Sequence, residues 1–554
     1  MSSISSSVAR PGSALPEADL VVSGAERVPR VLAWLAIAGI AAAILIMIGA
    51  SLVRSSWMLP PMDMPAAGPP WGLQTVHVPA AMVTLALWLS AILGGGSVAA
   101  GLLAVQRGAR PSLRLLFAVA VVAVAALVVL PPVGSTDALD YATYGRIMAL
   151  GHSPYVMTPY HLRVTQNAFA RSVPAKWENQ VSVYGPLATT EQFLAAKLGG
   201  ASPARIVFWL KLWNAIAFGI VAVVADRLLR SNPAMRMRAH LLWTVNPLLL
   251  WSLLAAGHLD LLAAAAGLLG LMTLGEQPRT ARADRYGTAL AGQSGILLTR
   301  QPRPQRLRPG LVRVLAAGAL LGVAADIKIN YVLFGLGAAW VLRRSPAALA
   351  AAAGGALAVV VPTYAWFGLP AVRALFSRRD ADNFYELFFY PHQVWRPQIA
   401  VMAAVLVVGV AGLLLRRMPP GAAGRTAIRP ALALSVAWLF FWPYQLPWYE
   451  TMGICLLVLY PATQLDWLVL ARLTASTTAN MPGNAWFPRA SQLAVINRDN
   501  MVVMAPMVLL AAGGCVVALC WSRRWKPSQP GVPPPRADGG PFEPLQSTTA
   551  GGVP

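Results

Sequence analysis

Two aspartates follow a long apolar segment at a spacing that suits a shared catalytic task. Asp137 and Asp140 come directly after the apolar run 115–132, and side chains three residues apart lie on one face of a helix. Ionisable groups at a membrane boundary are usually solvated, paired or functional. A carboxylate in this position could accept a proton from a sugar hydroxyl. The alternative, that both aspartates cap the helix that follows Ser135 and Thr136, is equally compatible with the residue types.

A second polar pair interrupts an otherwise apolar region. His258 and Asp260 separate the runs 239–256 and 259–275. A histidine and an aspartate flanked by apolar helices are typical of a site that faces a water-filled cavity. The alternative interpretation is a polar turn between two helices.

Three further polar residues could bind a phosphate group. Lys328 follows Asp326 at the end of the run 311–327, where it could meet a lipid phosphate or simply be neutralised by Asp326. His392 and Arg396 lie in the aromatic-rich stretch 385–396, and Arg can bind a phosphate through its planar guanidinium. The aromatic residues of this stretch, and those of 442–444 and 447–450, are expected at any membrane interface. Stacking of the latter two groups on a sugar ring is the more specific hypothesis.

The composition indicates the elements that must position these residues. Hydrophobic residues make up 57% of the chain and charged residues 12%, with a mean hydropathy of +0.57, whereas soluble domains contain about 25% charged residues. Lipid must therefore solvate the apolar excess. We predict an all-α, polytopic membrane protein with about 12–13 transmembrane helices, the first of them uncleaved. The apolar runs are 31–53, 78–104, 115–132, 205–225, 239–256, 259–275, 311–327, 329–342, 345–367, 398–415, 429–447, 451–465 and 501–522.

The arginines predict the orientation in the membrane. The net charge is +23, but the basic residues are spread between apolar runs, as the positive-inside rule requires. They lack the tight interleaving with aromatic residues that nucleic-acid binding needs. We therefore expect a cytoplasmic N-terminus, a cytoplasmic loop at 276–310, and outer loops at 132–204 and 368–397. The termini, 1–30 and 523–554, are expected to be disordered, and the transmembrane domain to span 31–522.

Three short motifs of the first outer loop resemble a known family. They are Asp137-x-x-x-Tyr141-x-x-x-Gly145, then Gly151-His152-Ser153-Pro154-Tyr155, and then Tyr184-Gly185-Pro186-Leu187. In this order they resemble the actinobacterial polyprenol-phosphomannose-dependent mannosyltransferases, which belong to the GT-C class of membrane glycosyltransferases. The similarity runs from about 115 to 470. Two positions depart from the family pattern, since Asp140 replaces a small polar residue and Leu259 replaces an asparagine.

The resemblance implies a GT-C-like fold and transfer of mannose from a polyprenyl-phosphate donor to a cell-envelope lipid or glycan, on the extracytoplasmic face of the cell membrane. It implies a general base at Asp137, with Asp140 as the second candidate. The remaining site residues are expected to divide between donor phosphate (Arg146, Lys328, His392, Arg396) and sugar or acceptor (Tyr141, Tyr155, Tyr184, His258, Asp260). We expect no metal, no other cofactor and no nucleic-acid partner.

Two other functional classes stay open on the sequence alone. A secondary transporter or lipid flippase would also be polytopic, and a non-catalytic partner of an envelope-building enzyme would share the topology. The sequence has no Walker loop, no dinucleotide glycine motif, no HExxH and no zinc-like cysteine spacing. These absences favour a lipid-linked donor that reaches the site from the membrane.

Overall fold

The computed structural model describes residues 17–53, 71, 76–165, 173, 177–275, 310–375, 396–420, 426–442, 446–480 and 513–514. Helices make up most of this described part, and no β-strand occurs in it. The all-α prediction is therefore confirmed. The predicted loop 276–310, the run 501–522 and the terminal segment 523–554 lie almost wholly outside the described residues.

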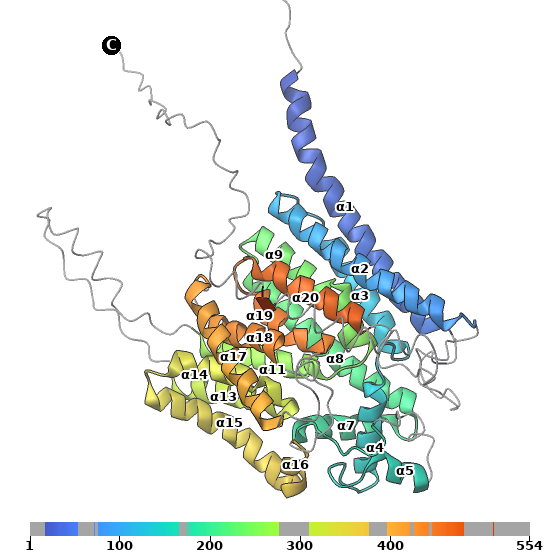
Figure 1. Ribbon diagram of the computed structural model, residues 1–554, viewed down its shortest axis with the longest axis vertical. Coiled ribbons are helices and arrows are strands. Elements are labelled where there is room, and N and C mark those ends of the chain that lie inside the picture. The colour runs from blue at the N-terminus through green and yellow to red at the C-terminus, as the bar shows by residue number, and fades with distance from the viewer. Residues whose placement is uncertain are drawn as a thin grey trace, which may run out of the picture.

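Most of the predicted apolar runs in the described part are helical and occur in the expected order (Figure 1), while further helices lie within the predicted outer loop 132–204 and the predicted run 451–465 is helical only to Leu457 at its start. The first part of the chain forms α1 (Glu17–Leu52), α2 (Ala80–Gln106), α3 (Leu113–Val129), α4 (Asp137–Ala149), α5 (Pro159–Thr165), α7 (Pro186–Gly199), α8 (Pro203–Leu228), α9 (Pro233–Ala239), the π-helical η1 (His240–Thr244), α10 (Pro247–Leu249), the π-helical η2 (Leu250–Ala255) and α11 (Asp260–Leu274). The second part forms α13 (Leu311–Ile327), the 3₁₀ turn η3 (Ile329–Tyr331), α14 (Val332–Leu342), α15 (Pro346–Phe367), α16 (Leu369–Ala374), α17 (Arg396–Arg417), α18 (Ile428–Phe441), the 3₁₀ turn η5 (Pro447–Tyr449), α19 (Glu450–Leu457) and α20 (Leu465–Ala479).

Several of these helices are long and apolar enough to cross a membrane. In the described part of the chain five qualify, namely Val28–Leu52, Ala81–Gln106, Pro203–Leu228, Pro346–Phe367 and Ala400–Arg417. A sixth span is added if the bent pair Pro233–Ala255 and Asp260–Leu274 counts as one. Shorter apolar helices cover Leu113–Val129, Ile329–Leu342 and Ile428–Phe441. The chain is thus a multipass membrane protein, and the total of about 12–13 spans stays a prediction.

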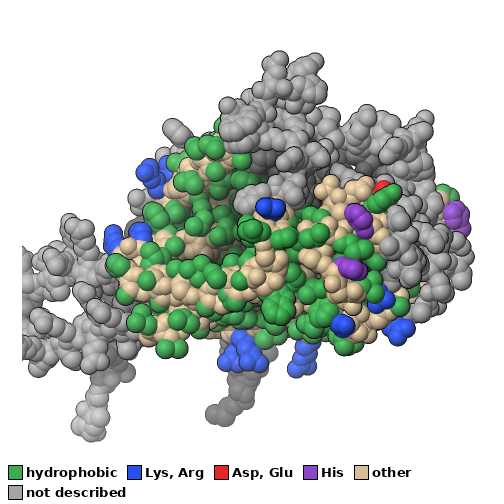
Figure 2. Space-filling model, turned by 90° about the horizontal axis from the view of Figure 1, so that it is seen from below, with side chains coloured by type: hydrophobic (Ala, Val, Ile, Leu, Met, Phe, Trp, Pro, Cys, Tyr) green, Lys and Arg blue, Asp and Glu red, His purple; other side chains and the backbone are tan. Residues whose placement is uncertain are grey.

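The surface of the bundle matches a lipid environment. Figure 2 shows one face on which apolar side chains cover much of the area and Lys and Arg side chains lie mainly toward the edges. The side chains of Val312 and Trp366 are 81% and 83% exposed. A contiguous apolar face with such side chains would be unfavourable in water. In lipid these side chains are solvated by acyl chains.

One sharp bend decides where the site forms. The helix pair Pro233–Ala255 and Asp260–Leu274 bends by 116° at its break, where two separate straight spans were expected. Gly257 adopts φ +75° in the break, and a Cβ at this position would come within 2.9 Å of Ala138 Cβ. Only glycine satisfies both the backbone angle and the close approach. The bend thereby packs the break directly against the first turn of α4.

Candidate active site

A cavity of about 390 Å³ lies where several helix ends meet. Its walls come from the first turns of α4, the segment that leads into α7, the end of α13 with η3, the end of α16, the end of α18, and η5. The lining residues are Asp137, Asp140, Tyr144, Trp177, Gln180, Val181, Val183, Tyr184, Lys328, Ile329, Asn330, Leu375, Trp438, Trp442, Leu446, Trp448 and Tyr449. Both aspartates and Lys328, which were predicted from separate parts of the sequence, therefore face one space.

The two carboxylates of α4 differ in their surroundings. The Asp137 side chain is 14% exposed, whereas Asp140 is buried and its Oδ1 has no hydrogen-bond partner in the described part of the chain. Burial, and then the nearby charge of Asp137, raise the pKa of Asp140 well above its usual value. Asp140 therefore retains its proton at a higher pH than an ordinary aspartate, and Asp137 is the better candidate for a proton acceptor. Asp137 is also the first residue of α4, so the capping interpretation stays open.

His258 does not line the cavity, but it contacts Asp137. Its Nδ1 lies 3.5 Å from Asp137 Oδ2 and 3.4 Å from the Tyr141 hydroxyl. The His258 ring stacks on Trp448, with ring centroids 3.6 Å apart and planes 18° apart. The Tyr184 hydroxyl donates to the Tyr141 hydroxyl at 3.3 Å, which continues the polar chain to the cavity lining. His258 is fully buried, so these contacts fix its orientation.

Lys328 is the cation among the described residues that line the cavity, and Asp260 pairs with it. Its Nζ donates to Asp260 Oδ2 at 2.6 Å and lies 4.5 Å from the centre of the Tyr449 ring. Asp260 is fully buried, and the Tyr331 hydroxyl donates to its backbone carbonyl at 3.0 Å. His258 lies in the turn between η2 and α11 and Asp260 begins α11, as the alternative interpretation predicted, and both side chains are buried.

Asp326 has a different role from the one its position beside Lys328 suggested. Its Oδ1 accepts from the Leu187 backbone N–H at 3.1 Å, and its Oδ2 accepts from the Thr363 hydroxyl at 2.6 Å. The hypothesis that Asp326 and Lys328 neutralise each other is therefore wrong. Asp326 instead ties α13 to the first turn of α7 and to α15.

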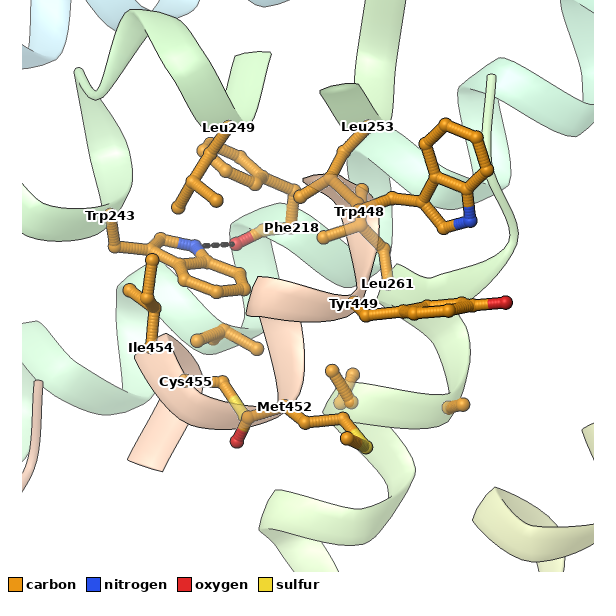
Figure 3. Packing of buried hydrophobic residues seen from close by; sticks show 14 of the residues in the cluster. Phe218, Trp243, Leu249, Leu253, Leu261, Trp448, Tyr449, Met452, Ile454 and Cys455 are labelled. Atoms are coloured by element: carbon orange, nitrogen blue, oxygen red, sulfur yellow. Dashed lines mark hydrogen bonds between the residues drawn. The ribbon is translucent and has the colours of Figure 1, made fainter. Parts of the chain in front are cut away.

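Aromatic side chains form another part of the cavity wall. Trp438 and Trp442 stack with centroids 6.0 Å apart and planes 16° apart. Trp448 and Tyr449 lie next to each other on η5, with Leu253, Leu261 and Met452 packed close by (Figure 3). Apolar aromatic faces beside polar groups are suited to stacking on a sugar ring, and the more specific of the two interpretations of this region stays a prediction. The wall residue Trp438 was missed in the sequence, although its spacing of four residues from Trp442 predicts a shared helical face.

Two buried ion pairs fix the helices that carry this wall. Glu450, which directly follows Tyr449, pairs with Arg472 of α20, and both side chains are fully buried. Arg238 binds both carboxylate oxygens of Asp466 at 2.5 Å. Breaking such a buried pair is strongly destabilising, so η5 is held firmly in place.

The other predicted site residues lie farther from the cavity or outside the described residues. Tyr155 does not line the cavity; its hydroxyl donates to the Tyr184 carbonyl at 2.9 Å and lies 2.8 Å from the Thr189 hydroxyl. Arg146 is on the last turn of α4 and donates to the Gly200 carbonyl at 3.5 Å. His392 lies outside the described residues. Arg396 begins α17, but its side chain is not described.

In the ranges that the structure describes, no group of three or more His, Cys, Asp and Glu side chains is placed to hold a metal ion. Two carboxylates, those of Asp137 and Asp140, line the cavity, and Lys328 at its wall pairs with the buried Asp260.

The fold and the cavity together define a class, that of helical multipass membrane proteins with a polar, aromatic-lined cavity between helix ends. The comparison with known proteins is more specific. Residues 36–344 match the family described as alpha-(1->6)-mannopyranosyltransferase, N-terminal domain. The match covers more than half of the chain and includes α4, the break at Gly257 and Lys328. The chain therefore belongs to this family, and the predicted membership of an actinobacterial mannosyltransferase family is confirmed.

Two curated relatives are similar to part of the chain. A protein of Mycolicibacterium smegmatis named probable alpha-(1->6)-mannopyranosyltransferase is 27% identical over 217 residues, which are 37% of this chain and 36% of the relative. Alpha-(1->6)-mannopyranosyltransferase B of Corynebacterium glutamicum is 28% identical over 193 residues, 32% of this chain and 30% of the relative. The chain thus spans about one third of the length of these relatives.

Proposed function

We propose that this protein transfers mannose from a polyprenyl-phosphate donor to a cell-envelope lipid or glycan on the extracytoplasmic face, with formation of an α-(1→6) linkage. The family and the names of both relatives support the sugar and the linkage. The observation that carries the proposal is the cavity itself, in which Asp137 and Lys328 face the same space beside an aromatic wall.

The chemistry follows from these two charged groups. The acceptor hydroxyl gives its proton to the Asp137 carboxylate while its oxygen forms a bond to the anomeric carbon of the donor. The bond between that carbon and the phosphate oxygen breaks, and its electron pair leaves with polyprenyl phosphate. Lys328 stabilises the negative charge that develops on the leaving phosphate. A single displacement inverts the anomeric centre, so a β-linked donor gives an α-mannoside.

The buried residues behind the wall position these groups. His258 orients Asp137 through the 3.5 Å contact, and Asp260 holds Lys328 through the 2.6 Å ion pair. Burial raises the pKa of Asp140, and the protonated form of its carboxyl is suited to donate a hydrogen bond to a sugar oxygen. Tyr184 lines the cavity as a proposed sugar contact. The Tyr155 hydroxyl positions Tyr184 by donating a hydrogen bond to its backbone carbonyl.

The donor is proposed to be bound by further cations from the outer loops. Arg396 begins α17 at a helix end, and His392 precedes it by four residues. Both residue types suit a lipid phosphate. Arg146 could serve the same purpose only if its contact with the Gly200 carbonyl is exchanged for the donor.

A reconstituted transfer assay tests the proposal. The purified protein in lipid nanodiscs is supplied with a short α-mannoside acceptor and either radiolabelled polyprenyl-phosphate mannose or the nucleotide sugar GDP-mannose. We expect transfer from the lipid-linked donor alone, with a product sensitive to an α-(1→6)-specific mannosidase. Equal transfer from GDP-mannose would contradict the donor assignment. Movement of the lipid-linked sugar across vesicles without transfer would support a flippase instead.

A further inference from the structure

A second cavity, of about 610 Å³, lies apart from the active site and shares no lining residue with it. It forms where the apolar span Val28–Leu52 of α1 begins, α2 ends and α3 begins. The lining residues are Pro29, Arg30, Ala33, Trp34, Ile37, Arg107, Gly108, Ala109, Arg110, Pro111, Ser112 and Leu115. Because the spans Val28–Leu52 and Ala81–Gln106 both end here, the cavity sits at a membrane boundary.

The rim of this cavity is cationic. Arg30, Arg107 and Arg110 line it from two different segments, and all three residues are exposed. Among the described residues that line it, none carries a carboxylate. Guanidinium groups bind phosphate oxygens through two parallel N–H donors. The N-terminus of α3, capped by the Ser112 hydroxyl at 3.4 Å from the Leu115 N–H, adds a favourable dipole for an anion.

The inner wall of the cavity is apolar. Ala33, Ile37 and Leu115 contribute aliphatic surface, and Trp34 is 64% exposed. Tryptophan prefers the headgroup level of a bilayer. The positive-inside rule accounts for arginines in a short loop, but not for their arrangement around a hollow with an apolar wall. Such a hollow matches a ligand with a phosphate at one end and hydrocarbon at the other.

We propose that this cavity binds an anionic phospholipid, with its headgroup phosphate held by Arg30, Arg107 and Arg110 and its acyl chains along Trp34 and Ile37. A free phosphate ion shares the headgroup chemistry but would leave the apolar wall without a ligand. The site is independent of mannose transfer, and its occupant holds α1, α2 and α3 together at this boundary.

Native mass spectrometry of the detergent-purified chain tests this proposal. The protein is titrated with phosphatidylglycerol or phosphatidylcholine, and phosphatidylglycerol binding is repeated in the presence of millimolar inorganic phosphate. The test variant changes the three cavity arginines to glutamine. The matched control changes three exposed arginines that line neither cavity: Arg227→Gln, Arg230→Gln and Arg344→Gln. A second test variant, Trp34→Ala, removes part of the apolar wall while keeping the cations.

We expect phosphatidylglycerol to bind more tightly than phosphatidylcholine. At roughly five-fold per arginine near an anionic headgroup, the triple cavity variant should bind it on the order of a hundred-fold more weakly, with the control within about two-fold of wild type. Trp34→Ala should also weaken the binding of phosphatidylglycerol. Equal losses in the cavity and control variants would overturn the site. Full competition by inorganic phosphate, with Trp34→Ala unchanged, would overturn the lipid and show a free-anion site. A cavity variant that does not fold is replaced by the three arginine-to-lysine changes, for which an intermediate loss is expected and no loss would overturn the role of the guanidinium groups.

Discussion

Removal of the Lys328 ammonium is expected to damage stability and catalysis by separable routes. In Lys328→Met, the carboxylate of Asp260 stays fully buried but loses the partner that now lies 2.6 Å away. Breaking a buried ion pair from one side costs about 3–5 kcal/mol. The Lys328 side chain is 11% exposed, so in Asp260→Asn it can turn toward the cavity. We therefore expect a smaller loss of stability in Asp260→Asn than in Lys328→Met.

The double variant Lys328→Met/Asp260→Asn separates the two effects. It leaves no uncompensated buried charge, so it should recover most of the stability lost by Lys328→Met, while mannose transfer stays as low as in the single variant. The measurements are apparent melting temperature in detergent and the rate of transfer at saturating donor. If the double variant recovered both stability and mannose transfer, Lys328 would not be needed to stabilise the leaving phosphate. The Lys328–Asp260 ion pair would then serve folding alone.

Three further outcomes are expected. Gly257→Ala should lower both the melting temperature and kcat, because φ +75° and a Cβ within 2.9 Å of Ala138 strain the break by about 1–3 kcal/mol; unchanged kinetics would contradict the role of the break. Glu191 lies in α7, and burial raises the pKa of its carboxyl to about 8. The folded state therefore favours the protonated carboxyl, whose contribution to the free energy of unfolding is complete below the usual pKa of 4.5 and is lost as the pH rises through 8. The melting temperature of wild type should fall over this interval more than that of Glu191→Gln, and parallel curves would contradict this reasoning. Trp448→Leu should raise KM for the acceptor and lower kcat, since Trp448 both lines the cavity and stacks on His258; an effect on melting temperature alone would show that the ring only packs.

The sequence predicted the helices well because each apolar run carries its own signal. Runs such as 205–225 and 345–367 coincide with α8 and α15, since lipid requires every spanning backbone to satisfy its hydrogen bonds internally. The break after η2 was predicted as the boundary between two runs, but its 116° angle was not. It depends on the contact of Gly257 with Ala138 of another helix, and hydropathy along one segment contains no information on such a contact.

The candidate site was predicted in its residues but not in its pairings. Asp137, His258 and Lys328 were selected because each is a polar residue beside apolar helix. That Lys328 pairs with Asp260, and not with the nearby Asp326, follows from the packing of α13 against α11 and α7. Aromatic residues such as Trp438 were missed because an interfacial belt and a sugar-binding wall have the same composition. Side-chain partners across helices are set by tertiary packing, which local patterns do not encode.

The most direct test of the account is mannose transfer by Asp137→Asn, measured from a polyprenyl-phosphate donor with Asp140→Asn as the matched control. Asparagine caps a helix about as well as aspartate, so both proteins should elute as single monodisperse peaks. Because asparagine cannot accept the acceptor's proton, Asp137→Asn should lower kcat by about 10²–10⁴-fold, and Asp140→Asn should lower it markedly less. Near-normal turnover in Asp137→Asn would contradict its role as the base, and a selective loss in Asp140→Asn would transfer that role to Asp140.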